Sequence, residues 1–243
     1  MKKPEIFKKE GFQINKEYLL YFEDILCPFP KLLQVFPQPF FIHKKRYREI
    51  YGYELKGLRF YLKIYTDCFF EAESEWKNLQ ILLERGFKPP KPIFYYKNRS
   101  YALIATEEVP GKPLSELLKE NPYLLKTLAN FMASFHKEKI FHQDCYLNHF
   151  YWDGKEIYIL DVSRVKINPL FSLKYQIKDL AQLGYSFETY FGKRGLECFE
   201  IFLKHYENLF TPLSSILKFL LFLKIKRIRK RTENAKKKLK GIL

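Results

Sequence analysis

The sequence has few of the features that mark secreted, disulfide-stabilised or membrane-spanning proteins. Its four cysteines show neither paired nor metal-type spacing, which predicts free thiols in a reducing cytosol. The first residues, Met1–Glu5, lead into no apolar segment, so no signal peptide is expected. The longest apolar run near the end, Phe219–Leu223, is far too short to span a bilayer. We therefore expect a soluble or peripheral cytosolic protein.

Acidic residues are also scarce. There are 27 Asp and Glu against 43 Lys and Arg, and the resulting net charge of +16 predicts an anionic partner. Residues 218–243 contain eleven Lys or Arg and a single acid, Glu233. This basic tail favours an anionic membrane surface or, less strongly, nucleic acid, with a solvated helix as the alternative. Five apolar residues there would either enter a membrane surface or pack on the protein: Leu217, Leu220, Leu221, Ile225 and Ile228.

The first hundred residues are rich in strand signals. Hydrophobic residues make up 47% of the 243-residue chain, enough for one large domain or two small lobes. Alternating segments on either side of Lys56-Gly57 predict a hairpin, and a helix with a terminal glycine follows it. The predicted elements are strands at Glu49–Leu55 and Leu58–Tyr65, a helix at Phe70–Arg85, and strands at Ile93–Tyr96 and Tyr101–Thr106.

The pattern becomes helical after Val109-Pro110-Gly111. Helices are predicted at Pro113–Leu118, from Leu124 toward His142, around Ile177–Tyr185, and at 195–209 and 213–231. The sequence therefore predicts an α+β fold with two lobes. A small, mostly antiparallel β lobe (residues 1–106) and a hinge (107–111) precede a larger α-helical lobe (112–217) and the basic tail (218–243).

Two acids, Asp144 and Asp161, are separated by a predicted hairpin. Strands at His149–Trp152 and Glu156–Leu160 flank Asp153-Gly154, a dipeptide typical of type I′ turns. We expect the hairpin to return Asp161 to the neighbourhood of Asp144. Two carboxylates so placed suit phosphoryl transfer, in which one orients the acceptor hydroxyl and the other holds Mg²⁺ on the phosphates. Either acid alone would more often be a loop cap or the end of a strand.

Lys63 and Glu75 precede these acids. Lys63 lies in a predicted strand, and Glu75 lies at the edge of the apolar stripe of the following helix, where it would lean toward Lys63. Taken alone, such a lysine is usually an edge charge and such a glutamate is usually solvated. Their order relative to Asp144 and Asp161 is what indicates a shared site.

Together these residues resemble the protein-kinase-like fold. Within that fold they resemble the lipopolysaccharide kinase family, bacterial enzymes that phosphorylate inner-core heptose or Kdo sugars. The most specific match is HQDCYLNHF around Asp144, where the family shows H-x-D-C-Y-x-x-H-F. Weaker matches are LKIY, SEW, TEE, ILDVSR and KDLAQLGYS, and the resemblance covers residues 40–190.

The resemblance implies ATP and Mg²⁺ as cofactors and assigns a role to each residue. Asp144 would be the catalytic base, and Asp161 would ligate Mg²⁺. Lys63 would bind the nucleotide phosphates while paired with Glu75. The hinge backbone at Glu107 and Val109 would meet adenine, and Asp179 would brace the backbone of the catalytic loop.

Three departures from ordinary protein kinases bear on the mechanism. No G-x-G-x-x-G loop precedes Lys63; the segment there is His43–Arg48, so Lys45 and Arg46 are expected to bind phosphate instead of backbone amides. His149 stands where protein kinases have Asn, and it would contact phosphate or leave a second metal site weak, since imidazole binds Mg²⁺ poorly. Asp161-Val162-Ser163 replaces Asp-Phe-Gly, which favours a constitutive small-substrate kinase.

The leading hypothesis is a kinase that acts on the lipopolysaccharide core glycolipid at the cytosolic face of the inner membrane. One alternative is an RNA-associated atypical kinase or ATPase that uses the basic tail. The other is a catalytically inactive protein that binds glycolipid or a partner, suggested by His149 and the missing glycine loop. Retention of Lys63, Asp144 and Asp161 together argues against the inactive form.

Overall fold

The computed structural model describes residues 4–9, 11–22, 26–27 and 29–240. The chain divides into two compact units, one extending to Pro110 and including 158–163, the other comprising Gly111–Ile157 and the residues from Arg164 onward. The sequence grouped 158–163 with the helical lobe. The structure groups them with the first unit, where the Ile159 N–H donates to the Lys88 carbonyl at 3.0 Å.

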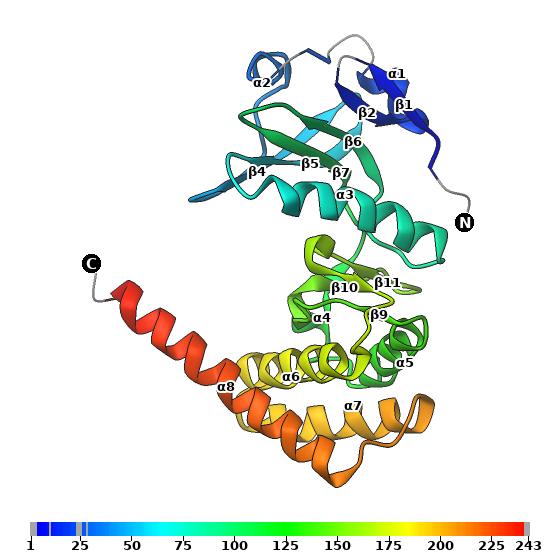
Figure 1. Cartoon of the computed structure of the whole chain (residues 1–243), viewed down its shortest axis with the longest axis vertical. Coiled ribbons are helices and arrows are strands. Elements are labelled where there is room, and N and C mark those ends of the chain that lie inside the picture. The colour runs from blue at the N-terminus through cyan, green and yellow to red at the C-terminus, as the bar shows by residue number, and fades with distance from the viewer. Residues whose placement is uncertain (1–3, 10, 23–25, 28, 241–243) are drawn as a thin grey trace. The chain divides into compact units, whose positions relative to one another are not determined.

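The first unit is built on a seven-stranded antiparallel sheet in the order β1-β2-β6-β7-β5-β4-β3 (Figure 1). This confirms the predicted antiparallel β lobe, although its first three strands were not among the predicted ones. Helix α3 (Phe69–Glu84) packs against β6 and β7. The strands are β1 (Ile6–Lys9), β2 (Phe12–Asn15), β3 (Phe41–Lys45), β4 (Arg48–Leu55), β5 (Leu58–Tyr65), β6 (Pro92–Lys97) and β7 (Ala102–Glu107).

An aromatic core fills the space between this sheet and two short helices, α1 (Leu19–Phe22) and α2 (Leu32–Val35). The Phe22 ring meets the rings of Phe60 and Phe94 edge-on, with centroids 5.3 and 5.4 Å apart. Aromatic pairs in this geometry add stability beyond the area they bury. Aromatic side chains thus cover one face of the sheet, together with only two four-residue helices.

The two predicted hairpin turns differ in outcome. Lys56 and Gly57 both have positive φ (51° and 78°), as a type I′ turn requires, and Leu55 pairs with Leu58. The type I′ prediction for Asp153-Gly154 was wrong, because only Gly154 has positive φ (101°). There the connection runs over residues 153–156, and the Asp153 carboxylate closes it by accepting two backbone N–H groups at 2.7 Å.

The second unit is mainly helical. Its helices are α4 (Leu114–Leu117), α5 (Leu124–Lys137), α6 (Ser172–Phe191), α7 (Gly195–Leu209) and α8 (Ser215–Lys240). Its strands are β8 (Lys112–Pro113), β9 (Ile140–Phe141), β10 (Phe150–Trp152), β11 (Ile157–Ile159, which continues into the first unit) and β12 (Lys166–Ile167). They form the sheets β11-β10-β8 and β12-β9. Helix α6 contacts both α7 and α8. The interior of the unit includes three fully buried aromatic side chains from α6 and α7: Phe187, Phe202 and Tyr206.

Helix α8 continues well beyond the end predicted at residue 231 (Figure 1). Arg229 makes a bidentate ion pair with Glu188 of α6, from Nη2 to Oε1 at 2.7 Å and from Nε to Oε2 at 3.2 Å, which fixes the middle of α8 to the rest of the unit. The last three residues of the predicted basic tail, 241–243, lie outside the described residues. Across the part of the chain that the structure describes, no helix is both long and apolar enough to cross a membrane.

Gly111 is required where β8 approaches β10. Its φ is +87°, and an added Cβ would lie 2.2 Å from the Trp152 carbonyl oxygen. We expect Gly111→Ala to lower the free energy of unfolding by about 1–3 kcal/mol more than Gly154→Ala, because steric overlap adds to the left-handed backbone penalty. Gly154 is the matched control, since its φ is +101° and nothing lies within 4 Å of an added Cβ. Urea denaturation of both variants measures the difference; equal losses would show that the close approach has no cost.

Candidate active site

The predicted pair of Lys63 and Glu75 forms within the first unit. Lys63 Nζ lies 2.5 Å from Glu75 Oε1, and Glu75 is only 2% exposed. The Tyr65 hydroxyl donates to the other carboxylate oxygen at 3.0 Å. Burial and the charge of Glu75 raise the pKa of Tyr65, so its hydroxyl keeps the proton that it donates. The ammonium of Lys63 is therefore held by a carboxylate that is itself fixed on its other side.

The hinge residues differ in what their backbones can offer. The Glu107 N–H already donates to the Lys91 carbonyl at 2.9 Å, and its carboxylate accepts from the Tyr18 hydroxyl at 2.9 Å. Val109 is half-buried, and its N–H makes no hydrogen bond among the described residues. The edge of a bound ligand would thus meet one hydrogen-bond acceptor, the Glu107 carbonyl, and one donor, the Val109 N–H.

The predicted cationic loop is a tight turn. Lys45 pairs with Arg48 in the β3–β4 register, so Arg46 and Tyr47 alone connect the two strands. Lys45 and Arg46 are both exposed. The turn contains neither a glycine nor a residue with positive φ. An anion bound here would therefore be held mainly by side chains rather than by backbone N–H groups.

Asp161 lies just beyond β11, in the part of that segment that belongs to the first unit. Its φ is +52°, a conformation that costs a non-glycine residue about 1–2 kcal/mol. The next residue is fixed by α3, because Asn78 Nδ2 donates to the Val162 carbonyl at 2.8 Å. Arg48 Nη1 lies 3.6 Å from Asp161 Oδ1. Neither contact was predicted from the sequence, in which Arg48 appeared only as the last residue of the cationic segment His43–Arg48.

Helix α6 fixes the loop that contains Asp144 in the second unit. Asp179, which is fully buried, accepts from the backbone N–H groups of His142 and Gln143 at 2.7 Å. Further along the same helix, Gln182 accepts from the Cys145 N–H and Ser186 accepts from the Leu147 N–H, each at 3.0 Å. Positions 179, 182 and 186 share one helix face. The predicted bracing role of Asp179 is confirmed, and Gln182 and Ser186 extend it.

His136 connects Asp179 to the helical core. Its Nε2 lies 3.3 Å from Asp179 Oδ2, and its Nδ1 lies 2.7 Å from the Tyr206 hydroxyl. A carboxylate only accepts, so Nε2 carries the proton and Nδ1 accepts from Tyr206. The thiol of Cys145, next to Asp144, is also buried, and burial raises its pKa well above the usual value. It is therefore a structural cysteine rather than a nucleophile.

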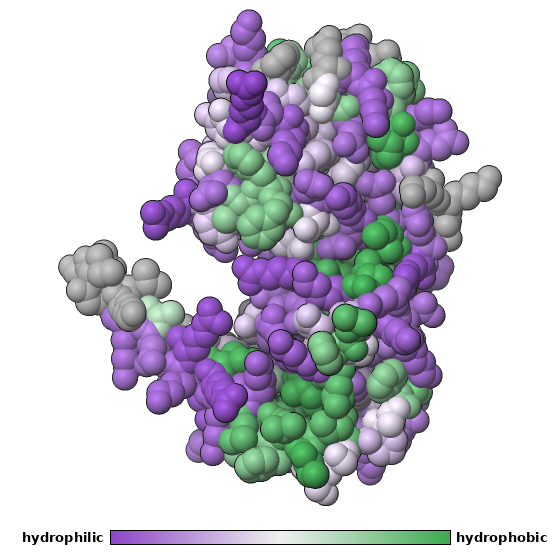
Figure 2. All heavy atoms as spheres, in the orientation of Figure 1, coloured by the Kyte–Doolittle hydropathy of each residue, from purple (hydrophilic) through white to green (hydrophobic). Residues whose placement is uncertain are grey.

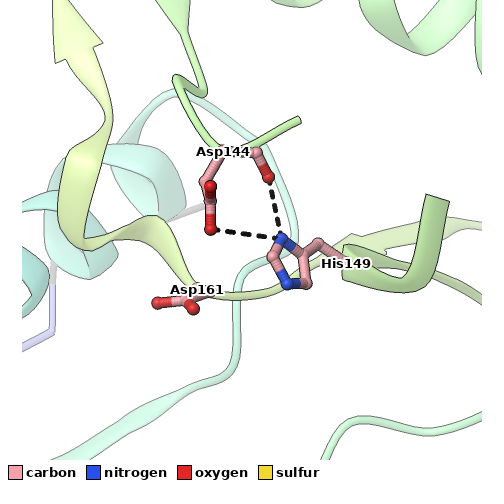
Figure 3. A group of neighbouring side chains, drawn as sticks. All are labelled: Asp144, His149 and Asp161. Atoms are coloured by element: carbon pink, nitrogen blue, oxygen red, sulfur yellow. Dashed lines mark hydrogen bonds and ion pairs between the residues drawn. The ribbon is translucent and has the colours of Figure 1, made fainter. Parts of the chain in front are cut away.

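Asp144 is partly exposed, and two cationic or ionisable side chains lie beside it. Figure 3 shows the His149 ring turned toward Asp144, with Nδ1 2.8 Å from its carbonyl oxygen and 3.9 Å from Oδ2. Because a carbonyl only accepts, Nδ1 carries a proton in this contact, which leaves Nε2 as the ring nitrogen open to another partner. Arg164 Nη1 lies 3.8 Å from Asp144 Oδ1. The sequence analysis did not single out Arg164, although it lies in the quoted segment ILDVSR.

These arrangements suit acid–base and anion chemistry. Asp144 is a carboxylate held by a fixed backbone and partly open to solvent, as a proton acceptor needs to be. Carboxylate oxygens such as those of Asp144 and Asp161 suit a hard cation such as Mg²⁺, whereas the imidazole of His149 suits it poorly. Lys63, Lys45 and Arg46 supply positive charge for a polyanionic ligand.

Comparison with known proteins identifies the relatives of the chain. The model of the "Lipopolysaccharide kinase (Kdo/WaaP) family" matches residues 69–199, more than half of the chain. No curated protein matches. Among solved structures, the chain is similar to WaaP in complex with acyl carrier protein, with a TM-score of 0.64, 20% identity, and coverage of 93% of this chain and 98% of that one. It is also similar to an aminoglycoside-3'-phosphotransferase of type VIII, with a TM-score of 0.57, 16% identity, and coverage of 73% and 87%. These likenesses confirm the predicted protein-kinase-like fold.

The Asp179 carboxylate can be tested by a change of one atom. In Asp179→Asn an amide N–H₂ would replace one of two oxygens that face N–H donors in a buried site. We expect the free energy of unfolding to fall by about 3 kcal/mol. Asp153→Asn is the matched control, because Asp153 also accepts two backbone N–H groups, through a single oxygen and in an exposed position, and should change stability by less than about 0.5 kcal/mol. Chemical denaturation compares the two; similar small losses would contradict the bracing role.

Proposed function

Because this chain belongs to the lipopolysaccharide kinase (Kdo/WaaP) family and is therefore a phosphotransferase, we propose that it transfers the γ-phosphate of ATP to a hydroxyl of heptose or Kdo in the lipopolysaccharide inner core. One observation carries the proposal most directly. The loop bearing Asp144, with the H-x-D-C-Y-x-x-H-F pattern, is fixed to α6 at three positions. It also lies inside the segment that the family model matches.

Asp144 is proposed as the general base. Its backbone is fixed by the α6 contacts, so its carboxylate can receive the proton of an acceptor hydroxyl without reorganising the loop. Arg164 and His149 beside it would bind the anionic groups of the donor or acceptor. In this role His149 would be the imidazolium, with Nδ1–H on the Asp144 carbonyl and Nε2–H donating to a phosphate oxygen.

Asp161, in the first unit, is proposed as the principal ligand of the divalent cation. Its carboxylate oxygens fit Mg²⁺, whereas the imidazole nitrogen of His149, in the second unit, fits it poorly. When bound, Mg²⁺ would neutralise charge on the transferred phosphate. The protein's own part is to hold the Asp161 carboxylate, which Arg48 and the Asn78 contact to Val162 support.

The first unit is proposed to bind ATP. Lys63, oriented by Glu75, would contact the phosphates. Exposed Lys45 and Arg46 would take the place of the backbone amides of a glycine-rich loop. The Glu107 carbonyl and the Val109 N–H would meet the adenine edge.

Helix α8 is proposed to place the enzyme on an anionic membrane surface at the cytosolic face of the inner membrane. Leu221 and Ile225, two of the five apolar residues noted in the tail, are buried, whereas Leu220 is exposed beside Ile216, Phe219 and Phe222. Figure 2 shows hydrophobic side chains gathered at the lower end of α8 and hydrophilic ones along its upper part. An apolar area next to a basic helix is the pattern of interfacial binding. An acidic protein, such as the acyl carrier protein bound to WaaP, is the competing partner for the same cations.

The kinase reaction can be tested with Mg·ATP and dephosphorylated inner-core lipopolysaccharide, with phosphate transfer measured by mass spectrometry. Wild-type protein should phosphorylate the core sugar, and Asp144→Asn should lower kcat by at least about 100-fold through loss of the base. The modified sugar then distinguishes heptose from Kdo.

Asp67→Asn serves as the control in that assay, since Asp67 is exposed and lies before α3. It should leave kcat unchanged. ATP binding without transfer to either sugar would refute the proposed acceptor and favour the RNA-associated or inactive alternatives.

Membrane binding can be tested by vesicle co-sedimentation. The variant Arg227→Gln/Arg231→Gln removes two exposed charges of α8 and should weaken binding to anionic vesicles roughly 30-fold, at about 1 kcal/mol per charge. Lys112→Gln/Lys119→Gln removes two exposed charges elsewhere in the second unit and should have little effect. Equal binding of wild-type protein to neutral and anionic vesicles, or to neither, would contradict the proposal.

A further inference from the structure

Arg48, the first residue of β4, is a buried cation. It pairs with Tyr65 in the β4–β5 register, and its guanidinium carbon lies 5.8 Å from the centre of the Tyr65 ring. The residue is only 8% exposed. Long cationic side chains normally keep the charged group in water, because burying a charge is costly. The position of Arg48 therefore requires a specific partner.

That partner is Asp161, whose Oδ1 lies 3.6 Å from Arg48 Nη1 within the first unit. Arg48 Nε is buried and makes no hydrogen bond among the described residues. A buried donor without an acceptor costs about 1–3 kcal/mol, and an apolar side chain often fills such a position at no loss of stability. Stability alone therefore does not explain an arginine here.

The contacts around Asp161 divide into two kinds. Helix α3 holds the backbone that follows, through Asn78 and the Val162 carbonyl, and the same helix holds Lys63 through Glu75. Arg48 contacts the Asp161 carboxylate itself. Of these contacts, the one made by Arg48 reaches the carboxylate and therefore bears on its direction.

We propose that Arg48 is a positioning residue that holds the Asp161 carboxylate in the orientation in which it takes the divalent cation accompanying the nucleotide. The proposal rests on the proposed use of Mg·ATP and is independent of the sugar acceptor. Direct phosphate binding by Arg48 is disfavoured, because the residue is buried and already paired, whereas Lys45 and Arg46 are exposed. Loss of a residue that orients a metal ligand typically weakens metal binding 10–100-fold.

The test measures how much the metal contributes to nucleotide affinity. Isothermal titration gives the dissociation constant of ATP with EDTA and with excess Mg²⁺, using the full-length protein. The constant in EDTA divided by the constant in excess Mg²⁺ is the gain in affinity that the metal provides. In Arg48→Met this ratio should be at least about 10-fold smaller than in the wild type, or equal to one if the gain is lost, while metal-free ATP binds as in the wild type. Arg48→Lys keeps the charge without the planar fork and should give an intermediate ratio.

Arg99→Met is the matched control, because Arg99 is an exposed cation of the same unit, and its ratio should equal that of the wild type. An unchanged ratio in folded Arg48 variants would overturn the proposal. A loss confined to metal-free ATP would also overturn it, in favour of direct phosphate contact. If Arg48→Met does not fold, Arg48→Lys decides. Wild-type protein that shows the Mg²⁺ effect but phosphorylates no sugar would refute the acceptor and leave this inference standing.

Discussion

The conformation of the loop that contains Asp144 depends on one buried carboxylate, that of Asp179. Asp179 accepts the N–H groups of two successive loop residues, His142 and Gln143, and a third donor from the Gln143 side chain. Gln143 has a φ of +66°, which a non-glycine residue adopts only when its surroundings demand it. The negative charge of Asp179 supplies that demand, because hydrogen bonds to an ionised acceptor are about twice as strong as neutral ones. The direction of Asp144 is thus set from within α6.

Each unit holds a non-glycine residue in a left-handed conformation at a candidate site residue or directly beside one. Gln143 precedes Asp144 in the second unit, and Asp161 has a φ of +52° in the first. Each is held by polar contacts to helices, Gln143 by α6 and the segment after Asp161 by α3. Such strain persists where the structure around it is rigid, and it commonly coincides with functional sites. The two helices therefore have parallel tasks, although their sequences share no motif.

The sequence predicts what depends on neighbours in the chain and misses what depends on distant ones. The Lys56-Gly57 turn and the inward direction of Glu75 follow from local periodicity, and both were correct. The Asp153-Gly154 turn failed because the Asp153 side chain offered a competing closure. The contact of Arg48 was missed for a different reason: Arg48 was grouped with the cationic segment before the predicted strand, and its partner Asp161 lies far along the sequence. The Asp144 loop was indicated by the hairpin that separates it from Asp161, and the role of each residue in it came from the resemblance to a family.

The turn between β3 and β4 has a consequence for inhibitor design. In protein kinases a glycine-rich loop covers the nucleotide phosphates, and its glycines leave the backbone free to change conformation. Here two residues, Arg46 and Tyr47, connect the strands, with no glycine to loosen them. A compound that relies on an adaptable flap would find none, whereas one carrying a fixed anionic group would meet lysine and arginine side chains. On the proposed role of this turn, selectivity over kinases with a glycine-rich loop is attainable at the phosphate end of the nucleotide rather than at the adenine end.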